Sequence, residues 1–210
     1  MKIALIIIGE LREIDKTIEL NREIFKNFDL FIGGYKYDRK YYKTLDCNKT
    51  LCLSSMNYIK KNVPKKVGVK KYKRSMLQWH HLDFVIKKQE EELLKYDAIL
   101  KIRTDTVFNT TFSFIKNKIN SLIKENNFFY YSDRIFFSKP DVFIKVFKNY
   151  YQSLNIKKYP ISEKALFNHF KSFKDINFNL INVYRILKIN AIVRGDFVKI
   201  SGEGKTNIFN

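Results

Sequence analysis

The sequence predicts one α/β domain whose mostly parallel central sheet is flanked by helices, with a small mixed α/β extension at the C-terminal end. Three observations predict this fold. An unbroken apolar run at residues 3–8 is typical of a strand that is buried on both faces. Strand-like and helix-like segments alternate from residue 1 to residue 105, as in parallel sheets covered on both faces. The length of 210 residues suits one domain and is short for two.

The first elements follow from local patterns. After the strand at 3–8, Asp15 is expected to cap a helix whose apolar positions recur at helical spacing. A second strand at 29–32 is expected to stop at Gly33 and Gly34. Residues 35–74 are rich in Tyr and Lys and show no comparable periodicity.

The middle of the chain has the clearest signals. Ser75 is expected to open a long helix whose inner face carries Leu, Val and Ile. A buried strand follows at 97–103, and a helix is predicted for 113–124. Two further strands at 128–131 and 135–137 are separated by Ser-Asp-Arg.

The last third is predicted to hold two helices and a short strand-like tail. Pro140 suits the first turn of one helix, because the proline nitrogen has no hydrogen to leave unbonded there. Ser162 is expected to cap the other helix. Residues 191–209 are strand-like and interrupted by glycines.

Composition excludes several protein classes. Apolar residues make up 45% of the chain and aromatic residues 16%, which excludes a disordered or low-complexity polymer. Two cysteines exclude a small disulfide-stapled fold. The net charge of +19 has two readings. It reflects either the Lys-rich bias of an AT-rich genome or an acidic partner, such as a nucleotide phosphate, an anionic membrane surface or nucleic acid.

Two polar clusters follow strands of the predicted sheet. Open α/β sheets bind ligands at the carboxyl ends of their strands. Gly9 and Arg12 come after the first strand, and Arg103 and Asp105 end the strand at 97–103. A glycine lets the backbone approach a phosphate, and an arginine binds diphosphate oxygens with its fork. The alternatives are that Arg12 is a surface residue and that Arg103 and Asp105 form a structural ion pair.

Four segments in this order resemble bacterial glycosyltransferases of lipopolysaccharide and capsule synthesis, which have a GT-A-like fold. They read GELR, QWHHLDFVIKKQEEELLKYD, AILKIRTDTVF and YYSDRIFFSKPDVF, and the likeness spans roughly residues 1–170. The positions that match the family pattern are Gly9, Arg12, Tyr96, Asp97, Arg103, Asp105, Ser132, Asp133 and Glu163.

The resemblance implies a nucleotide-sugar donor and a glycan or lipid-linked glycan acceptor. It implies that Gly9, Arg12, Arg103 and Asp105 bind the donor. It also implies Mn2+ or Mg2+ on Asp105, but Arg103 replaces the first acid of the usual D-x-D. Arg103 could therefore neutralise the diphosphate itself, and metal dependence stays open.

An inverting transfer needs a carboxylate that takes the proton of the acceptor hydroxyl. Asp133 and Glu163 are the candidate catalytic residues. The alternatives are that Asp133 is a turn carboxylate and that Glu163 favours the first turn of a helix through the macrodipole. Trp79 is expected to pack in the core, although stacking on an acceptor sugar is an alternative.

Organisation and location complete these expectations. Residues 1–210 are expected to form a single glycosyltransferase-like domain, and the resemblance implies a nucleotide-sugar-binding half at 1–108 and an acceptor-side half at 109–210. The absence of a signal peptide or spanning segment predicts a cytoplasmic protein. The basic segment 60–74 could place it on the inner face of the cell membrane. Two other functions remain open: a nucleic-acid-binding α/β domain, which is the less favoured, and an inactive transferase-fold partner subunit.

Overall fold

A computed structural model gives the structure of the chain. It describes residues 1–210 with the exception of 10–13, 37–38, 56–69, 154–161, 194–195 and 200–210. No helix in the described ranges is both long and apolar enough to cross a membrane.

Seven strands form the central sheet. They are β1 (Ile3–Ile8), β2 (Asp29–Tyr35), β3 (Lys49–Ser54), β4 (Ala98–Arg103), β6 (Asn127–Tyr131), β7 (Ile135–Ser138) and β8 (Asn177–Leu180). Their order is β3-β2-β1-β4-β7-β6-β8. The first four strands pair in parallel, and β7 is antiparallel to both of its neighbours. The parallel pair of β6 and β8 closes the far edge.

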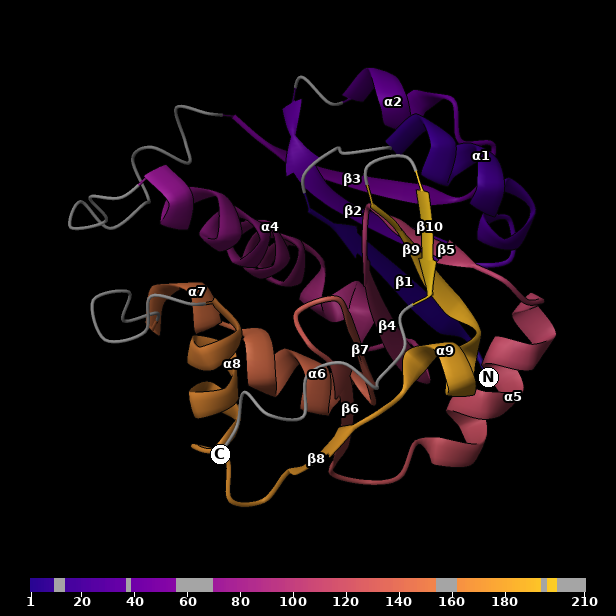
Figure 1. Cartoon of the computed structure of the whole chain (residues 1–210). Helices are drawn as coiled ribbons and strands as arrows, with labels where there is room; N and C mark the ends of the chain where they lie inside the picture. The colour runs from indigo at the N-terminus through magenta and orange to yellow at the C-terminus, as the bar shows by residue number, and fades with distance from the viewer. Residues whose placement is uncertain (10–13, 37–38, 56–69, 154–161, 194–195, 200–210) are drawn as a thin grey trace.

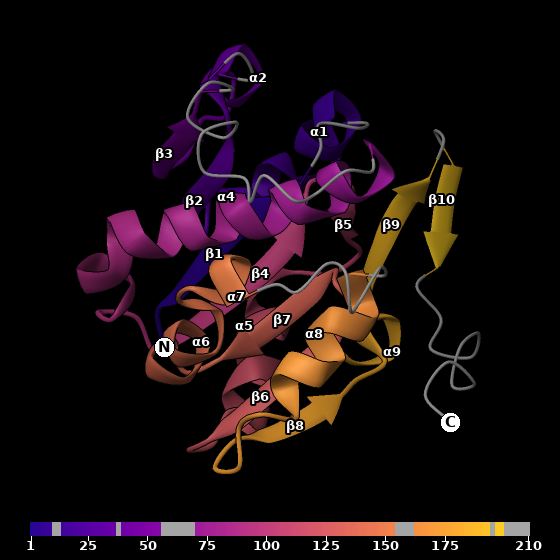
Figure 2. The same cartoon turned by 90° about the vertical axis from the view of Figure 1, so that its left-hand side faces the viewer.

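Helices cover both faces of this sheet. They are α1 (Ile14–Phe25), α2 (Arg39–Lys43), α4 (Lys70–Leu93), α5 (Phe112–Leu122), α6 (Pro140–Phe147), α7 (Tyr150–Ser153), α8 (Ser162–Phe170) and α9 (Val183–Leu187). Figures 1 and 2 show α4, α6, α7 and α8 on one face, with α1, α5 and α9 on the other. Strand β1 serves both cores, because Leu5 and Ile7 pack toward α1 while Ala4 and Ile6 pack toward α4.

A small second sheet ties the C-terminal region to the end of β4. It consists of β5 (Thr106–Phe108), β9 (Ile189–Val193) and β10 (Asp196–Lys199), in antiparallel pairs. Asn21 of α1 fixes β5 in place: its Nδ2 donates to the Thr106 carbonyl at 2.7 Å, and its Oδ1 accepts from the Phe108 amide at 2.9 Å. The segment that directly follows β4 is therefore held from two sides.

The predicted α/β class and the mostly parallel sheet flanked by helices are confirmed. The sheet takes β1–β4 from residues 1–108 and β6–β8 from residues 109–210. The strands expected at 3–8, 97–103, 128–131 and 135–137 are present within a residue or two. The helix at Pro140 begins with proline in its first turn, as expected.

Four local expectations were wrong. Ser162 is the first residue of α8 instead of preceding the helix. Asp15 lies in the first turn of α1 instead of preceding the helix. Strand β2 continues through Gly33 and Gly34. Helix α4 crosses the strand closely at Gly33, where a Cβ would lie 2.9 Å from Val85 Cγ2 and 3.0 Å from the His81 carbonyl oxygen. Glycine serves close packing there, not a turn. Helix α4 begins at Lys70, five residues before Ser75.

Candidate functional site

The carboxyl ends of β1 and β4 lie side by side in the middle of the sheet. Their register pairs Ile8 with Arg103, and the Thr104 amide donates to the Ile8 carbonyl at 3.2 Å. Gly9 follows β1 with φ of +135°, a conformation that side chains rarely adopt. A Cβ there would also lie 3.1 Å from Thr104 Oγ1. Glycine thus lets the backbone after β1 pass against the backbone after β4.

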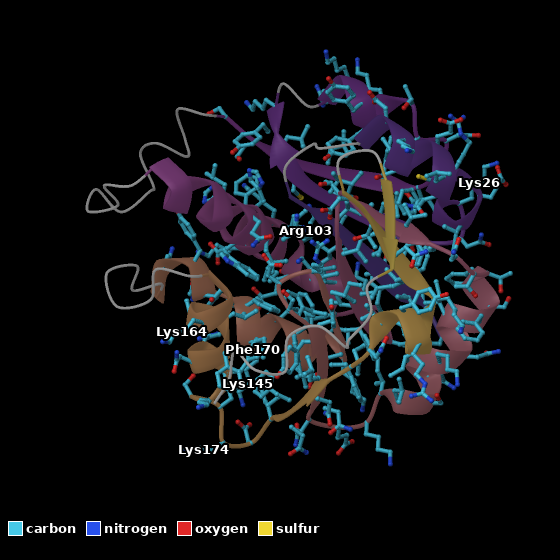
Figure 3. The ribbon with its side chains drawn as sticks, in the orientation of Figure 1. Lys26, Arg103, Lys145, Lys164, Phe170 and Lys174 are labelled. Atoms are coloured by element: carbon cyan, nitrogen blue, oxygen red, sulfur yellow. The ribbon has the colours of Figure 1, made fainter. Side chains whose placement is uncertain are left out.

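Arg103 and Asp105 form a bidentate ion pair at this point. Arg103 Nε donates to Asp105 Oδ1 at 3.1 Å, and Arg103 Nη2 donates to Asp105 Oδ2 at 2.9 Å. Figure 3 shows Arg103 near the middle of the molecule, beside α4. The ion pair considered from spacing alone is therefore present. The Arg103 side chain is 26% exposed.

The turn between β6 and β7 brings two more charges to Arg103. Ser132 has φ of +50°, and this left-handed turn presents Asp133 and Arg134. Arg103 Nη1 donates to Asp133 Oδ1 at 3.5 Å, and Arg134 Nη1 lies 3.5 Å from Asp105 Oδ2. Gln78 of α4 donates to Asp133 Oδ2 at 2.8 Å. Two carboxylates and two guanidiniums consequently meet at the end of β4; we call these four residues, Arg103, Asp105, Asp133 and Arg134, the charge cluster.

The surroundings favour the charged forms of Asp133 and Arg103. Burial alone would raise the pKa of Asp133, but Arg103, Lys101, Gln78 and Arg134 outweigh it and hold that pKa below its usual range. Burial likewise opposes the charge on Arg103, but the two aspartates outweigh it and raise the pKa of the guanidinium. Asp133 and Arg103 are therefore both charged at neutral pH.

Lys101 stabilises the turn between β6 and β7. Its side chain is fully buried on β4, two residues before Arg103. The ammonium donates to the Asp133 carbonyl and, at 3.3 Å, to the Arg134 carbonyl. It also lies 4.7 Å from the centre of the Phe136 ring and 5.6 Å from that of Trp79. Lys101 thus fixes the backbone that carries Asp133 and Arg134.

Substituting Lys101 should change how stability depends on pH. Burial is the main cause that lowers the pKa of Lys101 from 10.5 to about 7. Between these values the unfolded chain binds a proton that the folded chain lacks, so folding becomes more favourable as pH rises. We expect the wild type to gain stability relative to Lys101→Met from about pH 7 to pH 10. Urea unfolding of both proteins across this range measures the difference, and parallel curves would contradict the assignment.

The charge cluster does not fit a divalent ion. Both carboxylate oxygens of Asp105 accept from Arg103, and Asp133 is shared between Arg103 and Gln78. An ion on Asp105 would have to displace a guanidinium and would face Arg134 at close range. Within the described ranges, no group of three or more His, Cys, Asp or Glu side chains could hold a metal.

The structure brings together some of the residues that the sequence singles out. Arg103, Asp105 and Asp133 meet, and Gly9 lies against Thr104. Arg12 is outside the described residues. Glu163 lies in the first turn of α8, and its side chain is also outside the described part.

The sequence patterns do not single out three residues of this site, which are Lys101, Gln78 and Arg134. Lys101 had a usable signal, because a charged residue inside an apolar strand needs buried partners. No sequence signal indicates the roles of Arg134 and Gln78, since their contacts depend on how β7 and α4 pack beside β4.

No protein-family model matches the chain, and no curated protein sequence matches it. Among solved structures, the chain is similar to 4-diphosphocytidyl-2C-methyl-D-erythritol synthase from Anaerococcus prevotii DSM 20548. The sequence identity is 11%, the TM-score is 0.44, and the match covers 86% of this chain and 88% of that one.

Proposed function

We propose that the protein is a glycosyltransferase that moves a sugar from a nucleotide-sugar donor to a surface-glycan acceptor, of the lipopolysaccharide or capsule type. The observation that carries this proposal is the charge cluster at the carboxyl end of β4. It lies beside Gly9, at the edge where open α/β sheets bind ligands. The order of motifs that resembles bacterial surface-glycan glycosyltransferases supports the same function.

The proposed reaction places negative charge on the leaving diphosphate. The bond between the anomeric carbon and the diphosphate oxygen breaks, and its electron pair stays on that oxygen. A new bond forms from the acceptor hydroxyl oxygen to the anomeric carbon, and the hydroxyl proton leaves to a carboxylate. Cations that are already in position stabilise the developing charge without reorganisation. We assign this role to Arg103 and Arg134, with Arg12 near the nucleotide.

Two carboxylates are proposed as the base. Asp133 is ionised at neutral pH, as a base must be, but its lowered pKa weakens it as a proton acceptor. Glu163 is the second candidate, at the start of α8. We propose a cytoplasmic location, peripheral to the inner face of the membrane, through the basic segment 60–74. Residues 60–69 of that segment, and the side chains of the rest, lie outside the described part.

A thermal-shift panel tests the proposed function. UDP, GDP, ADP and dTDP are added singly, with and without Mn2+, and one of them is expected to raise the melting temperature. At a hundredfold excess over Kd the stabilisation is about 2.7 kcal/mol, or roughly 5–10 °C for a domain of this size. No shift with any nucleotide, together with steeply salt-dependent binding of DNA or RNA, would replace the proposal with a nucleic-acid-binding domain. A shift without turnover would favour an inactive partner subunit.

A further inference from the structure

Arg103 occupies the point on which two carboxylates converge. Asp105 accepts two hydrogen bonds from it, at 3.1 and 2.9 Å, and Asp133 accepts a third at 3.5 Å. Two acidic side chains that face one cation are the arrangement that usually surrounds a divalent ion. In this protein the cation is part of the chain.

We propose that Arg103 is a resident cation that binds the donor diphosphate in place of a divalent metal, so that the protein binds nucleoside diphosphates without Mn2+ or Mg2+. This inference rests on the proposed function and specifies how the same site holds its donor. The carboxylates hold the guanidinium in one orientation and keep it charged. The N–H donors of the guanidinium are therefore already oriented, and no metal ion is needed to orient them.

The Arg103 guanidinium retains the capacity to bind a further anion. A guanidinium has more N–H donors than the three contacts to Asp105 and Asp133 use. The Arg103 side chain is also 26% exposed, so a ligand can reach it. The Arg134 side chain is exposed to the same extent, and its Nη1 lies 3.5 Å from Asp105 Oδ2. Two partly exposed arginine side chains therefore contact one carboxylate, and their remaining N–H groups can donate to diphosphate oxygens.

A divalent ion has no comparable place in the cluster. The oxygens of Asp105 that would ligate it are already bonded to Arg103. Arg134 adds positive charge around the same point, and this disfavours a further cation. Arg103 stands where the usual D-x-D has its first acid, and the groups around it bind a guanidinium and leave no place for a metal ion.

Calorimetric titration separates this inference from the proposed function. The probe is the nucleoside diphosphate of the UDP, GDP, ADP and dTDP panel with the largest thermal shift, titrated in EDTA and again in Mn2+. We expect equal affinity in both buffers. Binding that requires Mn2+ would overturn the inference and leave the proposed function intact. No binding of any of the four in either buffer would overturn the proposed function as well.

Variants of Arg103 test the residue itself. Arg103→Ala is expected to weaken binding in EDTA by roughly ten- to a hundredfold, because a hydrogen bond between charged groups is lost. Arg103→Lys should recover only part of the lost affinity, since lysine keeps the positive charge but lacks the paired N–H donors of the guanidinium. Added methylguanidine should restore part of the affinity of Arg103→Ala. Arg22→Ala, an exposed arginine of α1, is the matched control and should bind as the wild type does. Equal affinity of wild type, Arg103→Ala and Arg103→Lys would contradict the assignment.

Discussion

Asp105→Asn is expected to reduce the rate of sugar transfer by at least about a hundredfold while the protein still folds. The asparagine side chain has the same shape, so it fits the same space. It removes the negative charge and one of the two oxygens that accept from Arg103. Arg103 then loses its fixed orientation toward the diphosphate. The rate is measured by chromatography of the nucleoside diphosphate that the reaction releases from the donor.

A matched control separates this effect from the loss of any ion pair. Asp175 pairs with Lys145 at 2.5 Å, but both side chains are more than half exposed. Exposed pairs contribute little to stability, so Asp175→Asn should leave both the rate and the melting temperature unchanged. An Asp105→Asn protein with a lowered melting temperature and full turnover would show that the Arg103–Asp105 pair is structural only.

Trp79→Ala is expected to destabilise the fold by about 3–5 kcal/mol. Trp79 is 1% exposed and lies between aromatic neighbours on α6, α7 and β7. Its ring stacks on Phe147 at 6.0 Å and 11°, and it meets Tyr150 edge-on at 5.2 Å. Removal of the indole leaves a large cavity directly above Lys101. Chemical unfolding followed by circular dichroism measures the change without relying on the fluorescence of the lost residue.

Two further variants make this test specific. The Trp79 Nε1 has no hydrogen-bond partner among the described residues, so Trp79→Phe loses ring area only and should cost much less than Trp79→Ala. Leu94→Ala, at a position that is 51% exposed, should change stability by less than about 0.5 kcal/mol. A Trp79→Ala protein of unchanged stability that has lost acceptor binding would instead support stacking on a sugar.

Sequence patterns were sufficient for the elements that are buried on both faces. Strands β1 and β4 appear as apolar runs because helices cover both sides of the sheet. The helical spacing of α5 and the proline of α6 were equally informative. Glycines misled at β2, because a glycine that permits close packing against α4 looks the same in sequence as one that ends a strand.

The sequence by itself determined the fold class and half of the charge cluster. Arg103 and Asp105 are two residues apart at a strand end, so local geometry alone lets them meet. Only the tertiary structure decided that Asp133 and Arg134 join them, because β7 runs antiparallel beside β4 and returns its turn to that end. The same packing buries Lys101 beneath the turn and places Gln78 of α4 against Asp133. These contacts join residues that are far apart in the chain, and local patterns carry no information about such pairs.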